Sequence, residues 1–288
     1  MEHPDTIHAM ANLAATYRNL RRYTEAEKLQ VQVLNASNKI LGVEHPNTVN
    51  AMAHLAVTYQ NLGKCTEAEK LQVQVLDASN RILGVEHPKT INVMAHLAAT
   101  YQNLGQFTEA EKLQAQVLDT SNRILGVEHP DTMNAMENLA ATYQNLGKYT
   151  EAEKLEIQVL DARNKILVLE HPDTVDAMAK LAATYQNLGK YTEAEKLQAQ
   201  VLDARSRTLG VKHPHTILAM TNLAITYRNL ARYTEAEKLE TQACESKSRV
   251  PAEESYTTTT MANVQEALEI QVPDAGSTVP GDPTSNST

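Results

Sequence analysis

The stretch Tyr143-Gln-Asn-Leu-Gly-Lys-Tyr-Thr-Glu-Ala-Glu-Lys-Leu155 predicts the end of one helix, a tight turn and the start of the next helix. Gly147 lies where the end of a helix favours a residue that adopts positive φ. Thr150 is expected to be the N-cap of the second helix, and Glu153 three residues later completes a Thr-x-x-Glu capping box. The stretch therefore indicates a helix–turn–helix unit.

The same unit recurs along the chain at a constant spacing. Its core, Thr-Glu-Ala-Glu-Lys-Leu, begins at Thr24, Thr66, Thr108, Thr150, Thr192 and Thr234, so the period is 42 residues. A fixed period of this length is typical of a solenoid, in which each unit buries its apolar face against the next. We therefore predict an all-α fold, a right-handed superhelical solenoid of six 42-residue helix-turn-helix repeats. The expected repeats are 3–44, 45–86, 87–128, 129–170, 171–212 and 213–248.

The pattern stops near Ser248. Residues 249–271 are predicted to be a linker and a possible capping helix, because solenoids need a polar cover on an open end. Residues 272–288 are rich in Pro, Gly, Ser and Thr and are predicted to be a disordered tail. The first repeat starts almost at Met1 with no capping segment before it, which suggests a missing N-terminal part or a gene model that starts late.

The charge and the composition exclude several classes of partner. The 288-residue chain has a formal net charge of −9, which argues against a nucleic-acid backbone as the main ligand. No apolar run reaches transmembrane length and the N-terminus does not read as a signal peptide, so we predict no membrane insertion and a cytoplasmic location. Cys65 and Cys244 show no disulfide framework.

Signatures of catalysis are missing from the sequence. It contains no G-x-x-x-x-G-K-[ST] loop, no H-E-x-x-H and no G-x-S-x-G motif, so we predict neither an enzyme nor a cofactor. His54 and His96 lack a carboxylate or thiol at ligand spacing, so no metal site is predicted.

The residues of each unit resemble a known repeat family. Asn12-Leu13-Ala14-x-x-Tyr17, Tyr23-x-Glu25-Ala26 and Val33-Leu34 match the signature of the tetratricopeptide repeat (TPR). The 42-residue period and the His-Pro-Asp-Thr opening at 129–132 and 171–174 resemble the kinesin light chain subclass. The resemblance covers about residues 3 to 248. The chain departs from kinesin light chain in lacking a heptad coiled coil and in carrying His or Lys at several positions that tend to be Asn.

This resemblance implies that the first helix of each pair lines a concave groove that binds a protein or peptide partner. One slot of that helix varies among polar residues while the Leu and Ala that follow it stay the same, which is typical of a recognition surface. The alternative interpretation is a solvated helix face. The candidate groove residues are Asn12, Arg18, Asn50, His54, Asn92, His96, Asn134, Asn138, Asp176, Lys180, Asn222 and Arg228.

We therefore predict a non-catalytic scaffold or adaptor that binds a peptide segment in the groove. One alternative is the ligand-sensing repeat tail of a STAND-type receptor, because the subclass is similar to such tails. A second alternative is an array that reads single-stranded RNA. The acidic balance and the 42-residue period count against RNA.

Overall fold

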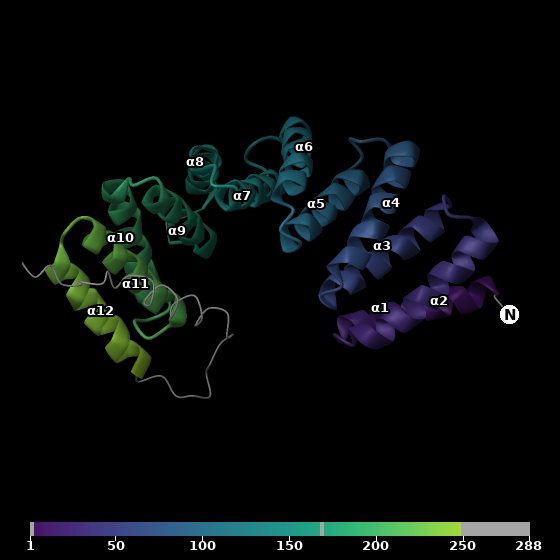
Figure 1. Cartoon of the computed structure of the whole chain (residues 1–288), viewed down its shortest axis with the longest axis horizontal. Coiled ribbons are helices and arrows are strands. Elements are labelled where there is room, and N and C mark those ends of the chain that lie inside the picture. Colours follow the sequence, from purple (N-terminus) through teal and green to yellow (C-terminus); the bar gives the residue numbers. More distant parts are fainter. Residues whose placement is uncertain (1–2, 168–169, 249–288) are drawn as a thin grey trace, which may run out of the picture. The chain divides into compact units, whose positions relative to one another are not determined.

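A computed structural model describes residues 3–167 and 170–248, and those residues form twelve α-helices and no strand (Figure 1). The prediction of an all-α solenoid built from six helix pairs is confirmed. The helices are α1 (Pro4–Asn19), α2 (Tyr23–Leu41), α3 (Pro46–Asn61), α4 (Cys65–Leu83), α5 (Pro88–Asn103), α6 (Phe107–Leu125), α7 (Pro130–Asn145), α8 (Tyr149–Ile166), α9 (Pro172–Asn187), α10 (Tyr191–Thr208), α11 (Pro214–Asn229) and α12 (Tyr233–Ser248).

The chain divides into two compact units, Met1–Gly189 with α1 to α9 and Lys190–Thr288 with α10 to α12. Within the first unit consecutive helices, from α1 to α9, pack against each other. Within the second unit α11 packs against both α10 and α12. This arrangement of neighbours is what a quasi-one-dimensional repeat protein requires. The predicted segments 249–271 and 272–288 lie outside the described residues.

The first helix of every pair begins at a His-Pro pair. Pro occupies the first helical position, where its missing N–H costs nothing. The preceding histidine is the N-cap, and its ring nitrogen accepts a hydrogen bond from a first-turn amide. In the fourth repeat, His129 Nδ1 accepts from the amide of Asp131 at 3.1 Å. The capping role of these histidines was not among the predictions.

The turn inside each pair differs in one respect from the prediction. Gly147 has φ +71°, as expected, but α8 begins at Tyr149, and its N-cap is Lys148 without a side-chain cap. Thr150 therefore lies within the first turn, and the predicted capping box is wrong. The side chain at the cap position instead contacts the preceding repeat: Lys148 Nζ donates a hydrogen bond to the Glu111 carboxylate at 2.7 Å.

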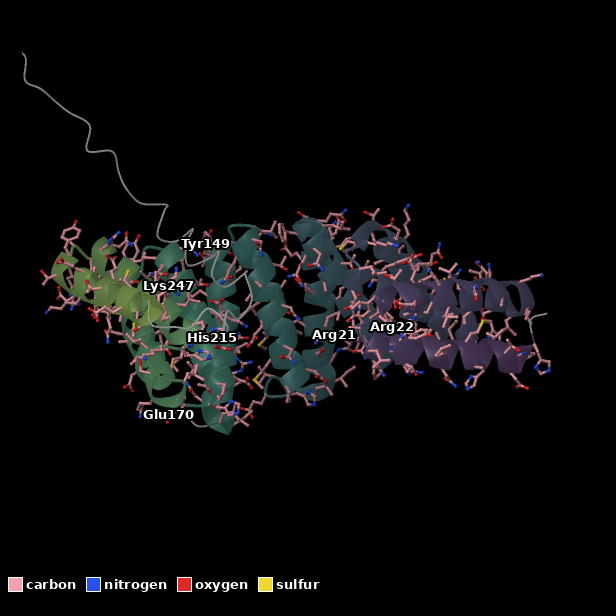
Figure 2. All side chains as sticks on the ribbon, turned by 90° about the horizontal axis from the view of Figure 1, so that it is seen from below. Arg21, Arg22, Tyr149, Glu170, His215 and Lys247 are labelled. Atoms are coloured by element: carbon pink, nitrogen blue, oxygen red, sulfur yellow. The ribbon has the colours of Figure 1, made fainter. Side chains whose placement is uncertain are left out.

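Two turns carry a side chain where the others carry glycine. Arg21, in the turn after α1 (Figure 2), has φ +58°, and Ala231 has φ +57°. Left-handed backbone is unfavourable for residues with a Cβ. The packing of the two helices therefore imposes the turn geometry. Arg21 and Ala231 adopt the left-handed conformation although it is unfavourable for them.

Small side chains allow the two helices of a pair to approach closely. Ala26 on α2 and its equivalents Ala68, Ala110, Ala152 and Ala194 are fully buried. The leucine of the first helix shows how the repeats cover each other: Leu55 is 3% exposed, whereas Leu13 on α1 is 45% exposed. The difference arises because α3 packs on α2 of the preceding repeat.

Candidate functional site

A pocket of about 570 Å³ lies between α1, α2 and α3. Its polar lining includes four of the predicted groove residues, Asn12, Arg18, Asn50 and His54. Its apolar lining includes Ala11, Ala15, Val33 and Ile40. Convergent polar groups above an apolar floor are typical of a ligand site.

Arg18 and His54 meet across two repeats within this pocket. Arg18 NH1 lies 3.3 Å from His54 Nδ1. A guanidinium only donates, so Nδ1 accepts, and the neutral ring must carry its proton on Nε2. Although His54 keeps contact with solvent, desolvation by the surrounding protein lowers its pKa, and the charge of Arg18 lowers it further. The pocket therefore presents a cation and additional N–H donors.

The other predicted residues are spread along the first helices of the later pairs. Asn138 lines a small pocket between α5, α6 and α7, and Lys180 lines a third pocket between α7, α8 and α9. Arg228 NH2 donates to Glu240 at 2.7 Å within the last pair. Asn92, His96, Asn134 and Asp176 are exposed, and Asn222 is half-buried.

Sequence reasoning missed a polar network that joins consecutive repeats. Thr100 on α5 is fully buried, and its hydroxyl accepts from Gln60 of the preceding repeat at 2.6 Å and donates to Gln72 at 2.7 Å. Thr142 repeats the pattern one unit later, with Gln102 at 2.7 Å and Gln114 at 2.6 Å. The available signal was a threonine that recurs without variation on an otherwise apolar helix face.

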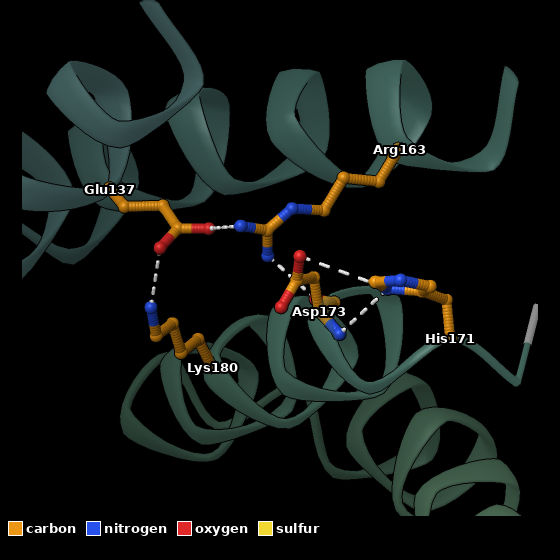
Figure 3. Close-up of polar contacts among 5 residues, drawn as sticks. All are labelled: Glu137, Arg163, His171, Asp173 and Lys180. Atoms are coloured by element: carbon orange, nitrogen blue, oxygen red, sulfur yellow. Dashed lines mark hydrogen bonds and ion pairs between the residues drawn. The ribbon is translucent and has the colours of Figure 1, made fainter. Parts of the chain in front are cut away.

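A cluster of charged residues lies where the fourth and fifth pairs meet (Figure 3). Glu137 on α7 points toward Arg163 of α8 and toward Lys180 of α9. Its Oε1 lies 2.6 Å from Arg163 NH2 as an ion pair without hydrogen-bond alignment, and its Oε2 accepts from Lys180 Nζ at 2.7 Å. Arg163 NH1 also donates to the Asp173 carbonyl at 2.6 Å. Among these, only Lys180 was a predicted site residue.

Glu156 on α8 is the other acidic residue of this junction. It is 5% exposed and takes the place of the glutamine of the inter-repeat network. Gln144 Nε2 donates to its Oε1 at 2.8 Å, while its Oε2 is buried without a hydrogen-bond partner. Burial raises the pKa of Glu156 to about 7, an effect that hydrogen bonding to Thr184 and the charge of Lys180 partly offset.

The part of the chain that the structure describes holds no group of three or more His, Cys, Asp or Glu side chains able to bind a metal ion. Among the described residues, no helix is both long enough and apolar enough to cross a bilayer. Cys65 and Cys244 are free thiols.

The family model described as Tetratricopeptide repeat matches residues 5–78, 50–102, 90–165 and 173–249. No curated protein sequence matches the chain. Among solved structures, the nearly identical TPR-like repeats of a protein described as a kinesin light chain from Podospora anserina share 35% identity. That match has a TM-score of 0.65 and covers 72% of this chain and 99% of that chain.

Two more distant structures share the fold. BtubC from P. vanneervenii has 18% identity and a TM-score of 0.64, with 92% of this chain and 99% of that chain covered. A STAND protein with a TPR sensor from Pyrococcus horikoshii has 16% identity and a TM-score of 0.69. That match covers 91% of this chain but 38% of the other.

The matches of the family model together span most of the described helices. The chain therefore belongs to the tetratricopeptide repeat family, with repeats similar to those of kinesin light chain-like proteins, and its fold is that of a protein-interaction scaffold.

Proposed function

We propose that the chain is a non-catalytic adaptor whose first helices form a groove for an extended peptide segment of a partner protein. The observation that carries the proposal is the pocket between α1, α2 and α3, where four predicted groove residues line one space. Asn side chains both donate and accept, so Asn12 and Asn50 suit the backbone of an extended peptide.

The chemistry of the pocket favours an acidic residue in the bound peptide. The Arg18 guanidinium keeps donors that the contact with His54 does not use, and His54 carries its proton on Nε2. A carboxylate accepting from both groups would make charge-assisted hydrogen bonds. The apolar floor of Ala11, Ala15 and Val33 would take a small hydrophobic neighbour.

The test begins with selection of peptides from a random displayed library on the full chain. Their affinities are then measured by fluorescence anisotropy for the native chain and for Arg18→Gln and His54→Asn. Both substitutions introduce residues that other repeats carry at the same slots, Gln60 and Asn138, so the fold is expected to tolerate them. Each should weaken binding about tenfold or more.

Lys28→Gln on α2 is the matched control, because Lys28 is exposed and lies outside the pocket lining. Its affinity should equal that of the native chain. Equal loss in all three variants would show a general charge effect, and no loss in Arg18→Gln or His54→Asn would refute a site in this pocket.

A second candidate is a ligand-sensing module, supported by the TPR sensor fold of the Pyrococcus horikoshii STAND protein, of which the match covers 38%. In that role the same groove would take the signal ligand of a larger receptor. Coding sequence next to this chain that carries a P-loop would favour the sensor over the adaptor.

A further inference from the structure

The repeats are near-identical, so they act as controls for one another, and the junction of the fourth and fifth pairs departs from the first three repeats at four slots. Glu137 stands where four other repeats carry Ala. Arg163 stands where the first three carry Ser. Lys180 stands where the others carry Asn or His, and Glu156 stands where four others carry Gln. All four departures introduce charge.

Three of the four new charged side chains pair with one another, one acid with two bases. Glu137 contacts Arg163 at 2.6 Å and Lys180 at 2.7 Å (Figure 3). The Arg163 and Glu137 side chains are 10% and 16% exposed, and the Lys180 side chain is 50% exposed. Each of these three side chains therefore has an oppositely charged partner within the set.

Glu156 is different, as the sixth repeat shows. That repeat also carries an acid in this slot, Glu240, and pairs it with Arg228 at 2.7 Å. In the fourth repeat the residue equivalent to Arg228 is Gln144, which donates to Oε1, and Thr184 is the other hydrogen-bond partner of the carboxyl, so both partners are neutral. The carboxyl of Glu156 thus lacks the cation that the chain supplies elsewhere, and its buried Oε2 has no partner.

A pocket of about 80 Å³ adjoins this carboxyl. It is lined by Glu137, Glu156 and Lys180 together with neutral side chains of α7, α8 and α9, including Ala140 and Ala177. Two carboxyls and one ammonium line the pocket. Arg163 and Lys180 both pair with Glu137, so Glu156 is the carboxyl without an ion-paired cation. The volume is enough for the end of one side chain.

We propose that this pocket is a cation subsite, which takes the ammonium group of a lysine side chain from a ligand in the groove, with Glu156 as the carboxyl that binds it. The proposal rests on the first helices forming a ligand groove, as proposed above. The bound peptide would then carry a basic residue in this pocket as well as the acidic residue that is expected to bind Arg18.

Proton linkage follows from the charges around Glu156. The charged groups nearest to it are Glu137 of α7, Glu153 of its own helix and Lys180 of α9. Because burial raises its pKa to about 7, a bound ammonium that stabilises the carboxylate would release a proton near neutral pH. Affinity for a lysine side chain should therefore rise with pH and level off above neutrality.

The experiment uses Nα-acetyl-lysine N-methylamide as the probe and the norleucine analogue as its uncharged control. The full chain is labelled with ¹³C at alanine methyl groups, and NMR follows the methyls of Ala140, Ala141 and Ala177, which line the pocket. With the lysine probe at pH 8 we expect saturable chemical-shift changes of these methyls. The norleucine analogue should bind at least about tenfold more weakly than the lysine probe. The probe is small enough to bind this pocket alone, so the result does not depend on whether a peptide binds at Arg18.

Two variants complete the test. Glu156→Gln restores the residue of four other repeats and should weaken probe binding about tenfold or more. Gln144→Arg copies the cation of the sixth repeat and should block the probe while keeping the fold, as judged by circular dichroism. Equal shifts with both probes, undiminished binding to Glu156→Gln, or no shift of the three methyls with the native chain would overturn the proposal.

Discussion

Gln144 on α7 and Thr184 on α9 are 40 residues apart, and a hydrogen bond of 2.7 Å joins Nε2 of the first to Oγ1 of the second. Equivalent bonds join Gln60 to Thr100 and Gln102 to Thr142. Each threonine is fully buried, so these bonds lie inside the interface between repeats. The network holds α3, α5, α7 and α9, and the proposed groove residues on them, in a fixed register to one another.

Replacing Thr142 by Val should lower the free energy of unfolding by about 1–3 kcal/mol, because Gln102 and Gln114 each lose a partner in a buried site. Urea unfolding followed by circular dichroism measures the change. Thr16→Val is the control at the same slot of the first repeat, where the side chain is exposed, and its effect should stay within about 0.5 kcal/mol. Equal effects in the two variants would contradict a structural role for the network.

Glu156→Gln should stabilise the chain in a pH-dependent manner. The pKa of Glu156 is raised from 4.5 to about 7, so between these values the folded state binds more protons than the unfolded state. Stability of the native chain therefore falls as pH rises through this window. The variant should match the native chain at pH 4 and exceed its stability by on the order of 2–3 kcal/mol at pH 8. A difference that is independent of pH would show that Glu156 titrates normally.

Glu137→Ala should destabilise the fold by about 2 kcal/mol or more, because the buried Arg163 side chain loses its acidic partner. The double variant Glu137→Ala with Arg163→Ser returns both slots to the residues of the first three repeats and should recover most of the loss. Thermal melts of the two variants and of Arg163→Ser complete a double-mutant cycle. Additive losses would mean that the ion pair does not couple the two residues.

Ala231→Gly should stabilise the chain by about 0.5–1 kcal/mol, because Ala231 holds φ +57° and glycine adopts that region without a Cβ penalty. The reverse change, Gly147→Ala, should cost about 1 kcal/mol. A Cβ at Gly147 would meet nothing within 4 Å, so backbone conformation alone accounts for the effect. Urea unfolding of both variants measures whether the free energy of unfolding rises or falls. A loss of stability in Ala231→Gly would refute strain at this turn.

Local features of the fold could be read from the sequence. The 42-residue period, the His-Pro starts and Gly147 in its turn specify helix ends through short-range preferences of the backbone. The failed capping box shows the limit of that reading. Thr150 and Glu153 have the right spacing, but α8 begins before them, and Lys148 at the cap position contacts Glu111 of the preceding repeat.

The candidate site was predictable only in part. The varying slot of Asn12 and His54 drew attention to the first helices, and the structure places both in one pocket. Glu137, Arg163 and Glu156 were not predicted as a site, because their meaning depends on which residues of other helices lie beside them.

The sequence by itself determined the helix pairs, their number and the family, because helix propensity, turn chemistry and an exact repeat are local properties. Only the tertiary structure decided that Thr100 and Thr142 are buried between repeats and that Glu156 lacks a cation where Glu240 has one. The physical reason is that burial and charge pairing depend on distances between side chains on different helices, which the packing of successive repeats sets.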